Sequence, residues 1–184
     1  MPLVTLEDFI RNTIIDELTI MVNTPRLKYL SFIVMSSAIE FLGACIDPNS
    51  NTPVDFHAWK PSGERFKLAI NKLNAFERYR DFLGAGKNKI DLYVELRCGM
   101  IHAVLPKSHV ELTERIDPII GKSHLKCLSL KNRSSPTSLI LVCEDLNADI
   151  RAAAEEVIMG LRNGNYHLKA IQPVLATDIM IATG

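Results

Sequence analysis

The chain has no excess of charge, because its 184 residues include 21 lysines and arginines against 21 aspartates and glutamates. Bulk charge therefore predicts neither nucleic acid nor a membrane surface as its partner. One segment departs from this balance, since residues 60–89 hold 8 basic residues against 3 acidic ones. Such a segment can contact RNA or another anion, and a solvated helix face has the same composition. Both interpretations stay open on composition alone.

Several motifs of catalysis and cofactor binding are absent. The five histidines form no HxxxH and no cluster with cysteine, so a dedicated zinc site is not expected. The GxSxG of serine hydrolases is missing. The stretch LGAGKNK lacks the GxxxxGK-Ser/Thr spacing of a phosphate-binding loop and follows a predicted helix instead of a strand. We therefore expect neither a metal nor a cofactor.

The four cysteines, at positions 45, 98, 127 and 143, include no CxxC pair. Their apolar neighbours predict small buried thiols in a reducing compartment. The first ten residues, MPLVTLEDFI, lack the basic start of a signal peptide. Residues 29–46 have the length of a membrane span, but they include Glu40 and three serines, which favours a helix buried inside a protein. We expect a cytoplasmic protein with no membrane attachment.

Helical periodicity dominates the first hundred residues. The hydroxyl of Thr5 can cap a first helix, and Thr24 followed by Pro25 predicts the start of a second one. The second helix has apolar residues on every face, which is typical of a central, buried helix. Pro106 ends a fourth helix. The predicted helices cover residues 5–23, 24–46, 62–83, 89–105 and, with Asp145 or Asn147 as its cap, 145–164.

The period changes after Pro106. Residues 108–144 approach the alternation of strands, with KNRSSP as a hairpin loop before the β-rich run TSLILVCED. We therefore predict a mainly α fold, an up-and-down bundle of four to five helices with a small antiparallel β-hairpin or sheet inserted before the last long helix. Residues 1–164 form one domain in this prediction. The apolar tail, 165–184, is expected to pack on the domain or on a partner protomer.

The stretch ELRCGMIHAVLPKSHVEL (95–112) places an arginine and a histidine five residues apart in apolar surroundings. Burying either side chain without a partner is costly. Glu40 is the only charged residue between Lys28 and Asp47, and we expect Arg97 to be its partner inside the protein. The alternative is that Glu40 reaches solvent at a gap between helices.

The spacing Arg-x4-His near the end of a helix resembles the HEPN superfamily, whose usual pattern is Arg-x4-6-His. SSAIEFLG (36–43) on the central helix adds to the likeness, which covers most of residues 24–163. The resemblance implies a helical, often homodimeric protein in which paired motifs form a cleft. Active members are metal-independent ribonucleases, in which Arg97 would hold phosphate and His102 would transfer protons while the RNA 2′-OH attacks.

Geometry makes a second protomer part of the catalytic interpretation. Five helical residues rotate by roughly 140° and advance about 7.5 Å, so a straight helix does not place Arg97 and His102 on one face. A shared cleft needs either a distortion near Gly99 or a dimer. The resemblance together with this geometry implies a second copy of the chain as a partner, and the resemblance alone implies RNA.

Two functions follow from the resemblance. Active family members commonly carry a polar residue directly after the arginine, where this chain has Cys98. We therefore expect a non-catalytic RNA-binding or protein-interaction module that keeps the motif. The alternative is a homodimeric, metal-independent endoribonuclease. The candidate residues are Arg97 and His102 for catalysis, Glu40, Cys98 and Tyr93 in support, and Arg97 and Lys107 for RNA phosphate.

Overall fold

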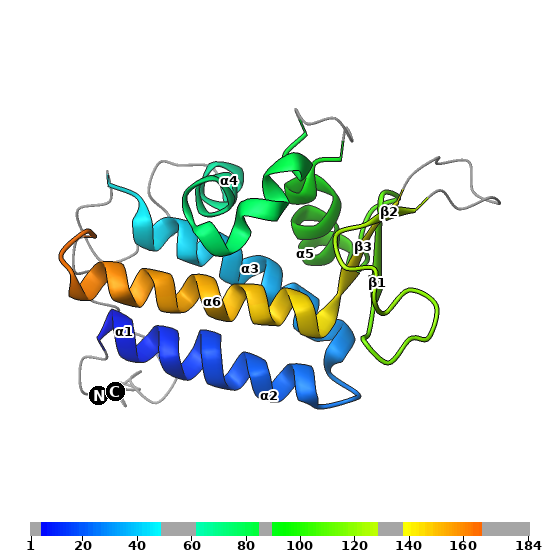
Figure 1. Ribbon diagram of the computed structural model, residues 1–184, viewed down its shortest axis with the longest axis horizontal. Helices are drawn as coiled ribbons and strands as arrows, with labels where there is room; N and C mark the ends of the chain where they lie inside the picture. The colour runs from blue at the N-terminus through cyan, green and yellow to red at the C-terminus, as the bar shows by residue number, and fades with distance from the viewer. Residues whose placement is uncertain (1–4, 49–61, 85–89, 129–137, 167–184) are drawn as a thin grey trace, which may run out of the picture.

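A computed structural model describes residues 5–48, 62–84, 90–128 and 138–166 (Figure 1). The fold is mainly helical with a small three-stranded sheet, which confirms the predicted class. The helical segments are α1 (Leu6–Phe9), η1 (Ile10–Glu17), α2 (Leu18–Asn23), α3 (Lys28–Ile46), α4 (Ser62–Lys72), η2 (Asn74–Phe82), η3 (Tyr93–Cys98), α5 (Gly99–Ala103) and α6 (Cys143–Arg162), and the strands are β1 (Val110–Thr113), β2 (Cys127–Leu128) and β3 (Ser138–Val142).

The first three segments form one continuous helical rod, as predicted. Thr5 caps it, because its hydroxyl oxygen accepts a 3.0 Å hydrogen bond from the Asp8 backbone N–H. The middle of the rod, η1, is π-helical. The rod ends at Asn23, where the sequence also placed its end.

The central helix α3 begins at Lys28 and not at the predicted Thr24. The Thr24 hydroxyl donates to the carbonyl oxygen of Ile20 at 2.8 Å, which ties it to the end of α2, and α3 starts after Leu27 without a side-chain cap. From Phe41 to Ile46 every residue of α3 is buried. Among the described helices, α3 alone has the length and apolarity of a membrane span, and most of it is covered by the rest of the protein.

Two predicted helices are interrupted. The predicted helix 62–83 breaks at Leu73, which has extended backbone angles, and continues as the 3-10 helix η2. The break is stabilised by Glu156 of α6, whose carboxylate accepts hydrogen bonds from the backbone N–H groups of Asn74 (2.8 Å) and Ala75 (3.3 Å).

The predicted helix 89–105 is shorter in the structure. The Asp91 carboxylate accepts hydrogen bonds from the backbone N–H groups of Tyr93 and Val94, so helical structure starts there. The first part, η3, is a π-helix, and α5 then ends at Ala103. Val104 follows in the left-handed region, with φ of 56°.

The sheet is mixed, which corrects the predicted antiparallel sheet. Its order is β1-β3-β2, with β1 parallel to β3 and β2 antiparallel to it. Strand β3 is central in this order and every one of its residues is buried, and an apolar run such as residues 139–142 is typical of a strand covered on both faces. The predicted loop KNRSSP lies outside the described residues.

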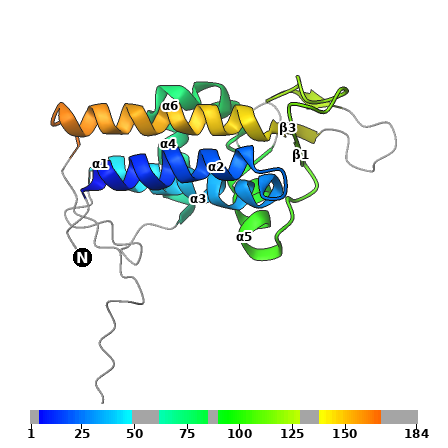
Figure 2. The same cartoon turned by 90° about the horizontal axis from the view of Figure 1, so that it is seen from below.

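Helix α6 follows β3 with no intervening loop and starts at Cys143, earlier than the predicted 145–147. It lies along the α1–η1–α2 rod and over α3, so α3 is covered by α6 and α4 from different directions (Figures 1 and 2). The predicted tail comprises residues 165–184. Of these the structure describes Asn165 and Tyr166, and Tyr166 packs against the core, whereas residues 167–184 lie outside the described part of the chain.

Candidate functional site

Arg97 and Glu40 form a mostly buried ion pair between η3 and α3. The Nε and Nη2 atoms of Arg97 each lie 2.9 Å from Oε2 of Glu40. The Arg97 side chain is 18% exposed and that of Glu40 is 10% exposed. The partner predicted for Glu40 is therefore confirmed, and the alternative of a solvent-exposed Glu40 is wrong.

Tyr93 holds the arginine from another side. The guanidinium carbon of Arg97 lies 5.8 Å from the centre of the Tyr93 ring, within the range of a cation–π contact. The Tyr93 hydroxyl is 2.5 Å from the Ser62 hydroxyl at the start of α4, and its ring lies 5.7 Å from that of Phe66. A Cβ atom at position 63 would come within 3.0 Å of the ring, so the absence of a side chain at Gly63 leaves room for the Tyr93 ring. Arg97 is thus packed as well as neutralised.

The chain between Arg97 and His102 is shaped by Gly99. A Cβ atom at this position would lie 2.6 Å from the carbonyl oxygen of Leu105, because the segment after α5 folds back against the helix. The backbone N–H of Lys107 donates to the carbonyl oxygen of Glu95 at 2.9 Å, and the Glu95 carboxylate accepts from the His109 N–H at 3.2 Å. The π-helix and this return segment are therefore one packed unit.

His102 shares no polar contact with the Arg97–Glu40 ion pair. It is exposed, and within the described part of the chain it forms no hydrogen bond or ion pair with Arg97 or with any other residue. Cys98 is half-buried, and Lys107 is exposed. The structure thus joins Arg97, Glu40 and Tyr93, and it does not add His102, Cys98 or Lys107 to their polar contacts.

The surroundings of His102 are apolar. The start of α3 and the end of α5 carry large apolar side chains that are 37–62% exposed. The two elements are tied together here, because the Tyr29 hydroxyl donates to the Val104 carbonyl oxygen at 2.7 Å. Sequence reasoning placed Ile101 and Val104 on a regular helix and did not single out this surface. We name it the α3/α5 surface, and it consists of Tyr29, Leu30, Ile101, Val104 and Leu105.

A second polar cluster joins η2, the segment before β2, and α6. The Tyr79 hydroxyl donates to Oδ2 of Asp149 at 2.7 Å and lies 2.8 Å from Nε2 of His124. Nδ1 of His124 accepts a 3.0 Å hydrogen bond from the backbone N–H of Val142. Burial and the charge of Asp149 raise the pKa of Tyr79 well above 10.0, so its hydroxyl stays protonated. Since Tyr79 is fully buried, this cluster ties elements together and offers no accessible catalytic group.

No set of three or more His, Cys, Asp or Glu side chains able to hold one metal ion occurs within residues 5–48, 62–84, 90–128 and 138–166. No protein-family model, curated protein or solved structure matches the chain, so the local geometry carries the functional argument.

Proposed function

We propose that the protein is a non-catalytic interaction module that keeps the HEPN-like Arg-x4-His motif, and that it associates with a second copy of itself through the α3/α5 surface. The mainly helical fold and the position of the motif at the end of a helix support the HEPN-like resemblance. The observation that carries the choice of function is the Arg97–Glu40 pair, because it occupies the arginine.

A phosphate-binding arginine needs free N–H groups and uncompensated charge. Arg97 directs Nε and one Nη at Glu40 and rests on Tyr93. RNA phosphate could use only the remaining guanidinium N–H groups, on an arginine whose charge Glu40 already compensates and whose side chain is 18% exposed. The compensated charge and the burial favour a structural role for Arg97 over a role in cleavage.

The surface beside His102 favours protein over RNA. Its five defining residues are uncharged, whereas RNA binding depends on cations that neutralise phosphates. An uncharged apolar surface is also self-complementary, because two copies related by a twofold axis can face each other without charge repulsion. A second copy of the chain is therefore the occupant that this surface fits best.

The proposal is tested by measuring the oligomeric state. In sedimentation velocity the full chain is expected to form dimers, and Ile101→Asp and Leu105→Asp are each expected to shift it toward monomer. Ile20→Asp is the matched control, since Ile20 is 65% exposed on α2 and is not part of the surface. A monomeric wild-type chain, or dimers that both variants retain, would refute the proposed interface.

Cleavage is tested separately on single-stranded RNA in the presence of EDTA. Because His102 is exposed, His102→Ala is expected to leave folding intact and is the cleanest probe of proton transfer. We expect no turnover from either protein. Metal-independent turnover by wild type that His102→Ala abolishes would establish the endoribonuclease instead.

A further inference from the structure

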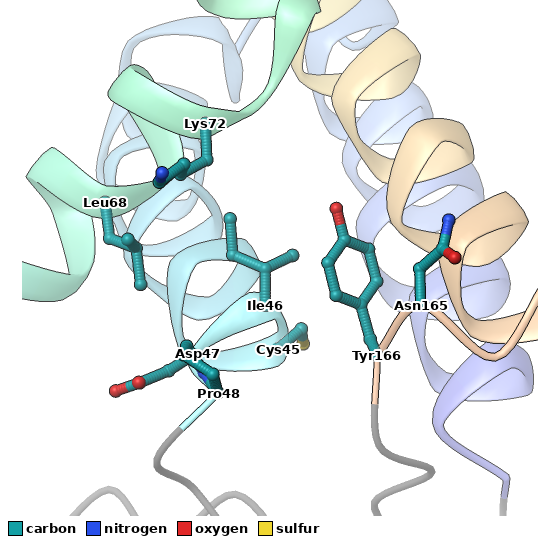
Figure 3. Close-up of a pocket in the computed structure, with 8 residues that line it drawn as sticks. All are labelled: Cys45, Ile46, Asp47, Pro48, Leu68, Lys72, Asn165 and Tyr166. Atoms are coloured by element: carbon teal, nitrogen blue, oxygen red, sulfur yellow. The ribbon is translucent and has the colours of Figure 1, made fainter.

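A pocket of about 420 Å³ opens at the far end of the protein, where the end of α3, the helix α4 and the residues after α6 meet (Figure 3). Ile46, Leu68 and Tyr166 give it apolar walls, and Lys72 lies at its edge. It shares no residue with the α3/α5 surface, so it calls for its own explanation.

The position of Tyr166 is built by the way α6 ends. The N–H of Gly164 donates to the Leu161 carbonyl oxygen at 3.2 Å, and that of Asn165 donates to the Gly160 carbonyl oxygen at 2.8 Å. Together with φ of 72° at Gly164, these bonds form a Schellman motif, which reverses the chain after a helix.

The reversed chain is held against α6. A Cβ atom at position 160 would lie 2.1 Å from Cε2 of Tyr166, so only glycine admits the ring there. Glycine inside a helix is less favourable than alanine by about 1 kcal/mol. The packing of the Tyr166 ring against position 160 explains why glycine occurs there. The helix end therefore places Tyr166, the last described residue, in the wall of the pocket.

Those following residues are apolar. Between 167 and 184 the only charged side chains are Lys169 and Asp178. Ile171 is five residues beyond Tyr166, and five residues reach at most about 17 Å. We propose that the segment 167–184 docks into this pocket of its own molecule, with the apolar side chains between Ile171 and Leu175 filling it.

The same chain is a better source of this segment than a second copy. A tether of a few residues gives the segment an effective concentration on the order of millimolar at the pocket, far above that of a separate molecule in dilute solution. The pocket and the α3/α5 surface share no residue and are tested by different variants. This inference therefore does not rest on the proposed function.

The experiment measures whether the segment shields the pocket. Leu68→Cys places a thiol in the wall of the pocket, on a half-buried position of α4. Its alkylation rate is compared in the full chain and in the same chain carrying Ile171→Asp and Leu175→Asp. We expect the intact segment to slow alkylation by about tenfold or more, since the reagent must wait for local opening.

Three controls make the result specific. Cys98 and Cys127 are partly exposed native thiols, so their rates report any general loss of structure. Val34→Cys places a thiol at a second partly buried position, on α3 and outside the pocket. Its alkylation rate is expected to be the same with and without the two aspartates. Thr177→Asp together with Thr183→Asp places the same two negative charges in the segment without removing a large apolar group, and is expected to preserve shielding.

Equal alkylation of Leu68→Cys with and without the aspartates would overturn the inference. Shielding that disappears on dilution would overturn it as well, because it would assign the docked segment to a second copy. Shielding that persists at every protein concentration and is lost only with the two aspartates is the outcome that supports docking within one chain.

Discussion

The carboxylate of Glu40 and the guanidinium of Arg97 leave water together when the chain folds. Such a pair gains little net stability over apolar residues of the same size, since both ions lose hydration. Removing one partner is different, because it leaves the other charge without compensation. The pair therefore makes the contact between α3 and η3 specific, and single substitutions should reveal it.

Arg97→Ala and Glu40→Gln are each expected to lower the free energy of unfolding by about 3–5 kcal/mol in urea denaturation. The double variant Glu40→Gln with Arg97→Ala is expected to lose less than the sum of the single changes, because no charge is stranded. Arg162→Ala is the control, since Arg162 is exposed and pairs with Glu7 at the surface, where an ion pair contributes at most about 1 kcal/mol. Unfolding curves of Glu40→Gln and wild type that coincide would contradict the structural role of the pair.

The sequence predicts the Glu40–Arg97 pair because each charge is isolated in an apolar stretch. No such signal marks the cluster of Tyr79, His124 and Asp149. Tyr79 is 45 residues from His124 and 70 from Asp149, and each has ordinary neighbours in the sequence. Only the tertiary fold brings them together. His102 is the opposite case. The Arg-x4-His spacing marks it in the sequence, but it has no polar partner among the described residues.

Asp149 is expected to make stability depend on acid pH. Burial raises the pKa of its carboxyl, but hydrogen bonds from His124 and Tyr79 outweigh this, so the net pKa lies below the ordinary 3.8. A lowered folded-state pKa contributes stability that is present above the unfolded value and is lost as the pH falls through the folded value.

Urea unfolding between about pH 6 and pH 2.5 should therefore show a loss of stability below about pH 3.8 that is smaller in Asp149→Asn than in wild type. Asp16→Asn, at an exposed position of η1, is the matched control and should keep the wild-type slope. Parallel curves for wild type and Asp149→Asn would show that this carboxylate does not contribute.

At the scale of elements, α3 and α4 approach closely at Gly43. A Cβ atom there would lie 1.9 Å from the carbonyl oxygen of Arg65, which is backbone and cannot move alone. Glycine in a helix is unfavourable by about 1 kcal/mol relative to alanine. The absence of a side chain at Gly43 allows the two helices to approach closely, which accounts for a glycine at this position.

Gly43→Ala tests which effect is larger. We expect a net loss of at least about 1–3 kcal/mol in the free energy of unfolding, because the forced separation of α3 and α4 exceeds the gain in helix propensity. Ser37→Ala on the same helix adds no volume and should change stability much less. A more stable Gly43→Ala protein would mean that the helices separate freely at this point.

The elements also show where sequence patterns stop being informative. Periodicity located the helices, because apolar spacing is a local property of the chain. It missed the break at Leu73, since the carboxylate that stabilises the break belongs to Glu156, more than 80 residues away. It also missed the parallel pairing of β1 with β3. The alternation of side chains along a strand does not show in which direction a neighbouring strand runs.

At the scale of the whole molecule, ion pairs fasten the N-terminal rod along α6. Arg11 contacts both Glu155 and Glu7, and Glu7 also contacts Arg162, so these contacts form one network where the start of the rod meets the last turns of α6. Lys28 bridges Glu114 and Glu144, which joins the start of α3 to the sheet and to the start of α6. These charges are used within the protein, whereas the α3/α5 surface is left apolar.

Self-association should therefore respond to salt as an apolar contact does. Raising NaCl from about 50 to about 500 mM is expected to leave the dimer dissociation constant nearly unchanged, and ammonium sulfate is expected to strengthen association. RNA binding through cations would weaken steeply over the same range. Sedimentation equilibrium at several salt concentrations distinguishes the two, and a steep loss of dimer with NaCl would contradict an apolar interface.

Strand β3 passes into α6 at Val142–Cys143 without a loop, and this junction has a mechanical consequence. A 20-residue helix is about 30 Å long, so α6 acts as a stiff lever with the sheet at one end and Tyr166 at the other. Because α6 also packs against α3, η2 and the rod, a tilt imposed where the chain reverses at Gly164 is resisted along the whole helix and not at the strand alone. The sheet and the far end of α6 are thereby held in a fixed orientation relative to each other.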